Sequence, residues 1–558
     1  MQRKRSKRRD HTAHTVVAST GMSGPSIALA GLPSSTVRKP GQATRGLRRL
    51  DEDVLLQIFE ELRPEHGLRP LSLTCKWVRE SVKPVLFRSC RQDALCLDWE
   101  LFVPRQLWPY IQNLLFHGIW ADIDPPHDNR RYDPFPLRQN LFEMSQLTTV
   151  RIVKTMEAGV PWTALVAILS LPQLRAFDIA GALYRERPER PHVPTFTAAP
   201  LRNYKQVLTD YRLSRYSLPD SLVLCVVLNQ SQIQESLESL EVPSEFAPLL
   251  LIAECRWSRL KRVVLRGENW EDDRPVVDLF IQMPALQELV LTLSHPQRSD
   301  LHRLCSPDWA GPLPWPELKT LSLTYPDPSD PVYSWLPTTL RHLTLCCWPR
   351  HYNSEDPAIR SAVETLGWDS PIQDSSAMLN ILRRCQCRQL ESLEIEFVGS
   401  ESDMELFQLI SHVFPDLSSL TLFRYRPRPA VKVPVREIGE SLRPLQRLRY
   451  LFLYLDFVEA PRLVYSGFRL GPFSTRHPEV ERARIMRIFE RSADSIARSL
   501  GPSLSIISFL LRGASANDWI AFRVRHASDG CHVHLAPQAL EEHGLKSRDH
   551  PTPPVPLY

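Results

Sequence analysis

The cysteines and histidines are the residues whose spacing comes closest to a chemical site. Cys385 and Cys387 flank one glutamine, Cys346 and Cys347 are adjacent, and the segment CHVH runs from Cys531 to His534. A structural zinc ion needs a full set of four such ligands, usually arranged as two close pairs. No second pair completes any of these groups, so we expect no metal and interpret CHVH as the end of a strand.

Sequence signatures of common enzyme classes are also missing. The chain has no G-x-x-x-x-G-K-[ST] phosphate loop, no G-x-G-x-x-G dinucleotide loop, no H-E-x-x-H motif and no G-x-S-x-G nucleophile turn. Nothing in the sequence marks a cysteine as a carrier of ubiquitin thioesters. We therefore predict that the chain is not an enzyme, and we expect neither catalytic residues nor a cofactor.

Basic charge is concentrated at the N-terminal end. Residues 1–46 hold nine Lys and Arg and one Asp, whereas the rest of the chain holds 59 basic and 62 acidic residues. Because the remainder is nearly neutral, we do not expect nucleic acid as a partner. The tail contains a candidate nuclear-import run, with nonspecific contact to nucleic acid and a solvated, disordered terminus as the alternatives. This run comprises Arg3, Lys4, Arg5, Lys7, Arg8 and Arg9.

Length and composition limit the architecture. The 558 residues suffice for two to four domains or for one long solenoid. No apolar run is long enough for a membrane span, and the N-terminus lacks the apolar segment of a signal peptide. The 11 scattered cysteines suit reduced thiols in an intracellular protein of the nucleus or cytoplasm. The 49 prolines favour many short elements.

The elements begin with an unusually apolar segment, Leu47 to Ser89. Asp51 can cap a helix there, since carboxylates suit the positive end of the helix dipole. The apolar residues that follow have the i, i+3, i+4, i+7 spacing of one helical stripe. They are Leu55, Ile58, Phe59 and Leu62, and we expect Pro64 and Gly67 to end the helix.

A second helical segment follows, and we expect Pro84 to break it. Its apolar residues are Leu68, Leu71, Leu73, Trp77 and Val78. Two or three short helices of this kind have more apolar surface than they can cover by folding on each other. Such a surplus usually marks a surface for a partner.

The segment resembles an F-box of the kind abundant in fungal proteins. Leu50 matches the opening leucine of the family pattern, although Asp51 stands where the family most often has proline. Further matches are Ile58, Phe59 and Leu62 in the first helix, Leu68, Leu71, Leu73, Cys75, Lys76 and Trp77 in the second, and Pro84, Leu86, Phe87 and Arg88 at the close. The alternative is an ordinary helical subdomain.

The resemblance implies a partner, because F-boxes bind the Skp adaptor of a cullin-based SCF ubiquitin ligase. The contact positions that it implies are Leu50, Leu55, Ile58, Phe59, Leu62 and Leu71. In that family other subunits perform the chemistry, which agrees with the lack of enzyme motifs.

The remainder of the chain repeats the pattern apolar-x-x-apolar-x-apolar. Seven of the ten intervals between successive units from Leu147 lie between 22 and 32 residues, close to the leucine-rich-repeat period of about 20–29. The units are LTTVRI from Leu147, LRAFDI from Leu174, LESLEV from Leu237, LKRVVL from Leu260, LQELVL from Leu286, LKTLSL from Leu318, LRHLTL from Leu340, LESLEI from Leu390, LSSLTL from Leu417, LRYLFL from Leu448 and LSIISF from Leu504, with a weaker IQNLLF from Ile111.

Each unit predicts a short strand. Its last two apolar residues are two apart and point to one face, and the residue between them points to the other. The intervening residues include Arg151, Glu241, Ser322, Thr344, Glu394 and Thr421, which we expect to be exposed on a concave recognition face. Helical patterns such as WTALVAILS, VVDLFIQM and MELFQLISHVF lie between units, and several end at a proline.

The predicted fold class is therefore α/β: a short helical F-box followed by an irregular leucine-rich-repeat solenoid with a curved parallel sheet and outer helices. A non-repetitive α/β fold remains the alternative. Two long stretches between units, Ala180–Ser236 and Cys346–Gln389, fit insertions or degenerate repeats. The second contains Trp348, Tyr352 and Trp368, residue types favoured at protein interfaces.

The predicted organisation is a basic tail at 1–46, an F-box at 47–90, a solenoid at 91–535 and a Pro-rich tail at 536–558. We expect a substrate-recognition adaptor that binds the Skp adaptor and, through it, a cullin ligase, while the repeats bind an unknown target protein. Two alternatives stay open: a repeat scaffold unrelated to ubiquitin, and an α/β enzyme with an unrecognised site.

Overall fold

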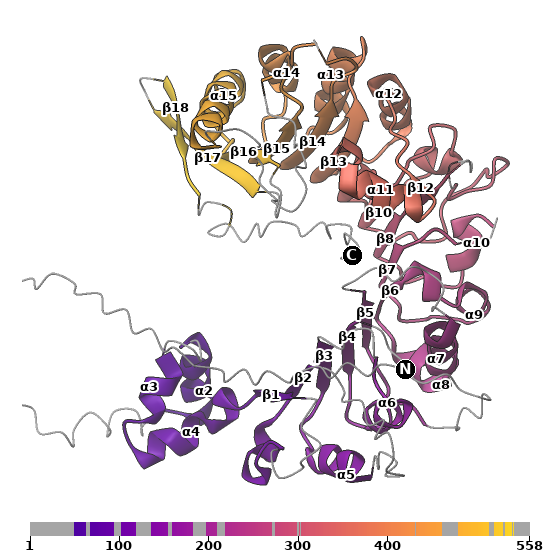
Figure 1. Cartoon of the computed structure of the whole chain (residues 1–558), viewed down its shortest axis with the longest axis vertical. Helices are drawn as coiled ribbons and strands as arrows, with labels where there is room; N and C mark the ends of the chain where they lie inside the picture. Colours follow the sequence, from indigo (N-terminus) through magenta and orange to yellow (C-terminus); the bar gives the residue numbers. More distant parts are fainter. Residues whose placement is uncertain are drawn as a thin grey trace, which may run out of the picture. The chain divides into compact units, whose positions relative to one another are not determined.

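The computed structural model of the chain (Figure 1) divides into two units, residues 1–68 and residues 69–558. The described residues are 50–62, 67–93, 102–118, 135–153, 159–181, 197–208, 218–270, 274–297, 301, 303–355, 357–429, 431–459, 478–512, 518–527, 530–537 and 540. The basic run Arg3 to Arg9 lies outside them, as does most of the predicted Pro-rich tail.

Helix α2 (Glu52–Glu61) belongs to the first unit. Asp51 is its N-cap, and the Asp51 carboxylate accepts a hydrogen bond of 2.9 Å from the Glu52 amide. Glu52 and Asp53 add negative charge to the first turn, where the helix dipole is positive. The helix ends at Glu61, just before Pro64 as expected, and the Leu62 amide donates to the Ile58 carbonyl over 3.1 Å.

The second unit begins with helices α3 (Arg69–Ser72) and α4 (Lys76–Leu86). The expectation that Pro84 breaks the helix is wrong, because α4 continues through it to Leu86. Pro84 lies in the last turn, where its missing N–H removes a single hydrogen bond. Burial of Val82 and Val85 on either side stabilises that turn, and the Phe87 amide still donates to the Lys83 carbonyl over 3.0 Å.

One large sheet follows, and each predicted unit contributes one strand to it. The strands from these units are β2 (Asn113–His117), β3 (Thr149–Val153), β4 (Ala176–Ala180), β6 (Ser239–Pro243), β7 (Arg262–Gly267), β8 (Glu288–Leu293), β10 (Thr320–Thr324), β11 (His342–Cys346), β13 (Ser392–Val398), β14 (Ser419–Tyr425), β15 (Tyr450–Leu455) and β16 (Ile506–Leu511). The other strands are β1 (Ser89–Asp93), β5 (Asn203–Val207), β17 (Asp518–Ala527) and β18 (Gly530–Leu535).

The strands lie in chain order, and the pairs from β1 to β16 are parallel. The predicted α/β class with a large parallel sheet is therefore confirmed. Two details differ from the expectation. β17 and β18 are antiparallel, and the stretch Ala180–Ser236 contains β5 and so includes a degenerate repeat. The sequence pattern missed β5 because Tyr204 and Gln206 occupy its two inward positions.

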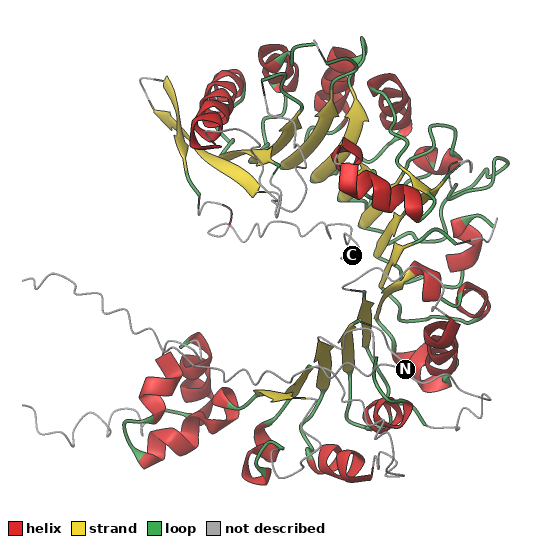
Figure 2. Cartoon of the chain, in the orientation of Figure 1, coloured by secondary structure: helices red, strands yellow, loops and turns green. Residues whose placement is uncertain are grey.

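Helices line one face of the sheet, which we call the helix face; the opposite face is the front face (Figure 2). The helices are α5 (Phe135–Glu143), α6 (Trp162–Leu169), α7 (Leu218–Leu228), α8 (Ser231–Ser236), α9 (Leu249–Glu254), α10 (Val276–Phe280), α12 (Ser375–Arg384), α13 (Asp403–Val413), α14 (Val435–Leu442) and α15 (Pro478–Ser499). The 3-10 turns η3 (Arg105–Tyr110), η6 (Ser244–Phe246), η7 (Pro331–Ser334) and η8 (His351–Glu355), helix α11 (Pro357–Thr365) and the strand pair β9 (His295–Pro296) and β12 (Trp368–Asp369) complete the described elements.

A ladder of backbone hydrogen bonds at the strand entrances sets the register. The Arg202 amide donates to the Arg175 carbonyl over 2.7 Å, and the Glu238 amide donates to the Arg202 carbonyl over 2.8 Å. The same step recurs along the sheet as far as Ser505, which donates to Arg449 over 2.9 Å. Because each repeat is fixed on the previous one at the same position, equivalent leucines align in rows.

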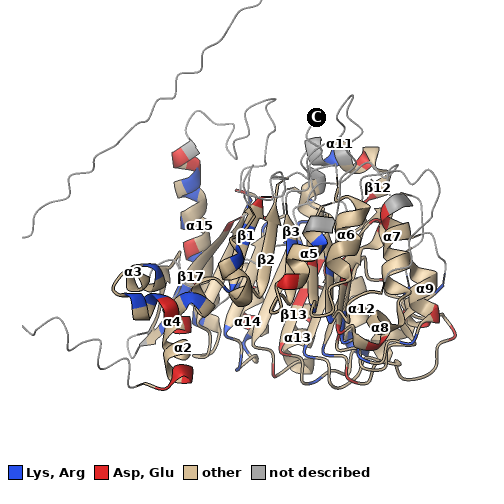
Figure 3. Ribbon diagram, turned by 90° about the horizontal axis from the view of Figure 1, so that it is seen from below, with Lys and Arg blue, Asp and Glu red and all other residues tan. Residues whose placement is uncertain are grey.

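The aligned leucines form the core. One row contains Leu289, Leu321, Leu343, Leu393, Leu420 and Leu451, each at most 1% exposed. The helices that cover these rows match the sequence patterns, since α6, α10 and α13 are the three predicted ones. α13 ends at Val413, and Pro415 follows it as expected. On α15, acidic and basic side chains alternate (Figure 3), and ion pairs such as Arg498–Asp494 support the long helix.

Candidate functional site

Helix α2 has two apolar stripes, whereas the sequence analysis expected one. Leu55 and Phe59 form the first stripe and are 6% and 1% exposed. In this conformation they are therefore buried. The second stripe consists of Leu50, Val54, Ile58 and Leu62, whose exposed fractions lie between 36 and 44%. We call these four residues the exposed stripe.

The predicted contact set is therefore divided. Leu50, Ile58 and Leu62 are exposed, Leu55 and Phe59 are buried, and Leu71 of α3, in the second unit, is half-buried. Val54 was missed, although its spacing of four from Leu50 and from Ile58 was a usable signal. The burial of these residues does not test whether they bind the Skp adaptor, so that role stays a prediction.

The second candidate surface is the front face of the sheet. The strand register places Arg151, Asp178, Lys205 and Glu241 directly beside one another across β3, β4, β5 and β6. All four are residues at the middle of their strands, on the face opposite the leucines. Charges of opposite sign therefore alternate along this part of the sheet.

Hydrogen-bonded ion pairs join these side chains. Arg151 donates to Asp178 over 2.9 Å, Lys205 lies 3.3 Å from Glu241, and Arg262 of β7 reaches Glu241 over 3.0 Å. Arg262 also lies 3.1 Å from Glu288 on β8. Several of these side chains keep a large exposed fraction, for example 57% for Arg151 and 46% for Lys205. We call the front face of β3 to β8 the open section.

Two carboxyl groups at this section differ in proton affinity. Burial acts to raise the pKa of Glu241, but Lys205, Arg262 and Arg266 outweigh it, so its pKa is lowered. Burial raises the pKa of Glu245 to about 7, and the nearby Glu268 carboxylate adds to the rise. Glu241 is therefore the charged partner that holds the three cations together.

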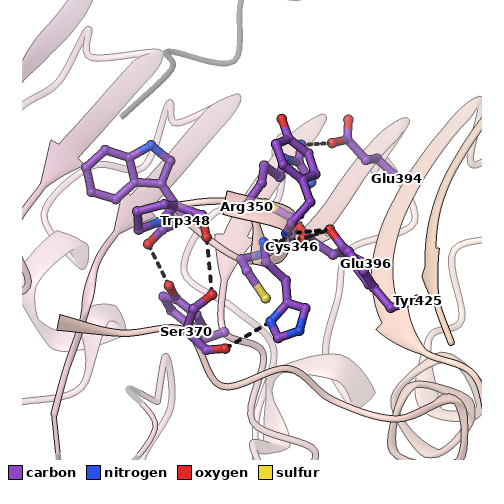
Figure 4. A network of polar contacts seen from close by, with 12 residues as sticks. Cys346, Trp348, Arg350, Ser370, Glu394, Glu396 and Tyr425 are labelled. Atoms are coloured by element: carbon purple, nitrogen blue, oxygen red, sulfur yellow. Dashed lines mark hydrogen bonds and ion pairs between the residues drawn. The ribbon is translucent and has the colours of Figure 1, made fainter. Parts of the chain in front are cut away.

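The front face of β13 to β15 is different, because the segment after β11 lies over it (Figure 4). We call this part the covered section. Arg350 is 4% exposed and forms ion pairs with Glu394 and Glu396 of β13, the latter over 2.9 Å. Its guanidinium also lies 4.2 Å from the centre of the Phe423 ring. The arrangement is that of a buried, hydrogen-bonded and stacked arginine.

The Glu396 carboxylate has further donors. It accepts hydrogen bonds from the backbone amides of Cys347 over 2.9 Å and His351 over 2.8 Å, and from the Tyr425 hydroxyl over 2.8 Å. Four donors including Arg350 thus converge on one carboxylate. These four donors satisfy the hydrogen-bonding capacity of the Glu396 carboxylate. Burying a charged carboxylate without such partners would cost much free energy.

Two expectations are wrong in the covered section. Glu394 and Thr421 were expected to be exposed, but they are 2% and 8% exposed. Arg350 lies against Glu394, and Glu394 and Phe452 flank Thr421 in the sheet. Glu241 in the open section was also expected to be exposed and is 5% exposed, because three cationic side chains surround it. The aromatic residues of the segment after β11 were expected at a partner surface, but Trp348, Tyr352 and Trp368 are at most 5% exposed. Tyr352 packs with Phe423, Tyr425, Tyr454 and Leu510.

The thiols of the cysteine groups differ in their surroundings, since burial raises several of their pKa values whereas a hydrogen bond with Cys385 lowers the pKa of Cys387. Burial raises the pKa of Cys346 to about 12 and that of Cys347 above its ordinary value. Cys385 and Cys387 are also buried. In the part of the chain that the structure describes, no three His, Cys, Asp or Glu side chains gather as metal ligands.

Membrane spanning was also considered. Within the described ranges, none of the helices combines the length and the apolar character that crossing a bilayer requires.

Comparisons with known proteins find similarity in structure but none in sequence. No known protein-family signature matches the chain, and no curated protein matches it. Among solved structures, the leucine-rich repeat-containing protein LegL7 from Legionella pneumophila is similar, with 10% sequence identity over 75% of this chain and 90% of that chain. The TM-score is 0.20, so the likeness supports no further argument. The α/β assignment rests on the sheet itself, and the resemblance to an F-box stays a prediction.

Proposed function

We propose that the chain is a non-catalytic substrate-recognition adaptor. In this proposal the exposed stripe of α2 binds the Skp adaptor of a cullin-based ubiquitin ligase, and the open section of the sheet binds a target protein. The observation that carries the proposal is the exposed stripe itself. Single exposed leucines are common, but four large exposed apolar residues at spacings of four, two within α2 and one just beyond each of its ends, are typical of a surface that a partner covers.

The energetics of the exposed stripe suit a docking helix. Fully burying one Leu, Ile or Val side chain is worth about 1.5–3 kcal/mol. Each residue of the stripe is already more than half covered, so each would add only part of that. Four such contributions in one stripe fit recognition of a helix in an apolar groove, where anchors recur every three or four residues.

The open section suits a protein target better than a small molecule. Its side chains are long, charged and spread over the front face of six strands, β3 to β8. Charges of both signs alternate there, so a complementary partner would carry an alternating pattern as well. Such a surface contributes specificity and orientation, since exposed ion pairs each contribute about 1 kcal/mol or less.

Co-purification of the full chain with the recombinant Skp adaptor tests the proposal. Ile58→Asp places a carboxylate in the middle of the exposed stripe and is expected to abolish binding. Gln57→Asp is the matched control, because Gln57 is exposed on the same helix but lies outside the stripe. Circular dichroism of both variants checks that the chain stays folded. Unchanged recovery of the adaptor by folded Ile58→Asp protein would refute the docking role.

A repeat scaffold without a ligase is the second candidate, because the open section does not depend on α2. Proximity labelling in cells with the unaltered chain and with Ile58→Asp separates the two functions. An adaptor labels cullin-ligase subunits only with an intact stripe, whereas a scaffold labels the same neighbours with both chains.

A further inference from the structure

The hairpin of β17 and β18 ends the sheet and differs from the repeats before it. Both strands run antiparallel to their neighbours, and β18 is the terminal strand in the described sheet. A terminal strand offers backbone N–H and C=O groups on its outer side, where another strand can pair. Natural edges are often blocked by proline or lysine, and the β18 sequence GCHVHL contains neither.

The register identifies which backbone groups face outward. In an antiparallel pair, opposite residues alternate between pairs that exchange hydrogen bonds and pairs that do not. The Ala536 amide donates to the Ala521 carbonyl over 2.9 Å, so the hydrogen-bonded pairs of the hairpin include Arg523 with His534 and Arg525 with His532. The backbone groups of the residues in between, Cys531, Val533 and Leu535, therefore point to the outer edge.

The front face of this hairpin carries two arginines, which are cationic, and two histidines, which become cationic when they bind a proton. Arg523, Arg525, His532 and His534 are cross-strand neighbours and share that face, and the last three are exposed. The opposite face is apolar, since Phe522 and Val524 belong to the core. Asp518, the acidic residue of β17, lies on that opposite face by the alternation of the strand.

We propose that β18 accepts an extended acidic segment of a partner protein as an additional strand. The partner's backbone would pair with the outer groups of Cys531, Val533 and Leu535. Acidic side chains at every second position of that segment would then lie beside His532 and His534, with Arg525 one strand further in. Main-chain pairing provides affinity in this mode of recognition, and side chains on alternate positions provide specificity.

Charge also decides between this partner and a second copy of the chain. Pairing of β18 with another β18 would bring the cationic side chains of two copies together on one face. Like charges that face each other across strands are destabilising, whereas opposite charges contribute about 0.2–1 kcal/mol for each pair. The acidic segment is thus the better occupant. This proposal does not rest on the proposed adaptor function, because β18 lies outside both surfaces used there.

Fluorescence anisotropy with the full chain provides the test. The probe is a labelled peptide in which Val and Glu alternate, and the comparison peptide has Lys in place of Glu. The acidic peptide is expected to bind at least about ten-fold more tightly. Val533→Pro removes an outward N–H without removing a bond to β17, so it is expected to abolish binding with little change in the melting temperature.

A second variant keeps the proposal testable if Val533→Pro does not fold. Arg525→Glu combined with His532→Glu should reverse the preference between the two peptides. Lys432→Glu, at an exposed site far along the chain, should leave both affinities unchanged. Equal binding of the two peptides, no binding of the acidic peptide at about 1 mM, or full affinity in folded Val533→Pro protein would each overturn the proposal.

Discussion

The open and covered sections of the front face have the same sequence pattern and opposite environments. In the open section, Arg151 is 57% exposed and its ion pair with Asp178 is accessible to water. In the covered section, Arg350, Glu394 and Glu396 are buried together under the segment that follows β11. The exposed ion pair of the open section contributes little to the free energy of unfolding. In the covered section, removing one partner of the ion pair leaves a buried charge and is strongly destabilising.

The comparison also explains the division of roles along the sheet. The covered section has no front face left for a target, since its aromatic side chains pack on one another. The open section keeps long charged side chains at the surface and is where we place target binding. The inserted segment therefore stabilises the covered section, and the open section is the part of the front face for which we propose recognition.

Removing Arg350 should have the largest effect. Arg350→Ala leaves Glu394 and Glu396 buried without their cation and should lower the free energy of unfolding by about 3–5 kcal/mol. Arg151→Ala in the open section is the matched change and should cost no more than about 1 kcal/mol. Urea unfolding of both variants measures the difference, and equal losses would mean that the two sections are not distinct.

Core leucines should behave alike inside the covered section and outside it. Leu321 in β10 and Leu420 in β14 are both fully buried on the helix face. Leu321→Ala and Leu420→Ala should each cost about 2–5 kcal/mol, because each leaves a cavity in the same row. Thermal melts compare the two variants. A large loss for one and none for the other would show that the repeats do not share one continuous core.

The residue between the leucines should respond differently inside the covered section and outside it. Thr421→Glu places a carboxylate in a site that is 8% exposed and directly beside Glu394, and it should cost about 2–3 kcal/mol. Ser322 is half-buried with Val290 and Thr344 as its neighbours, so Ser322→Glu should cost within about 0.5 kcal/mol. Similar shifts in the melting temperature would contradict the covered arrangement.

Acid titration should show the smallest effect. The pKa of Glu241 is lowered in the folded chain, so its ionised form stabilises the fold above the ordinary pKa of a glutamate. That contribution disappears as the pH falls through the lowered value. Glu241→Gln should therefore be less stable than the unaltered chain by up to about 1 kcal/mol at neutral pH, and the difference should vanish once the pH lies below the lowered pKa of Glu241. A constant difference at all pH values would exclude the ionised carboxylate as the cause.

Some of the candidate site could not be predicted from sequence. The spacing of Leu55, Ile58, Phe59 and Leu62 correctly indicated one helix, but it could not divide them into a buried and an exposed stripe. That division depends on what packs against each side of the helix. Repeat β5 escaped detection for a related reason, since Tyr204 and Gln206 are buried at positions where the pattern expects aliphatic residues.

The sequence by itself determined the strands of the recurring units, their order and their inward residues. Alternation of apolar residues specifies one face of each strand, and the recurring unit places neighbouring repeats in the same register, as the ladder of backbone hydrogen bonds requires. Tertiary structure alone decided which part of the front face is open. Ser322 and Thr421 occupy identical positions in their units, but Ser322 is half-buried, whereas Thr421 is 8% exposed beside Glu394, with which Arg350 of the segment after β11 forms an ion pair. Contacts between residues so far apart leave no mark in the local pattern of either unit.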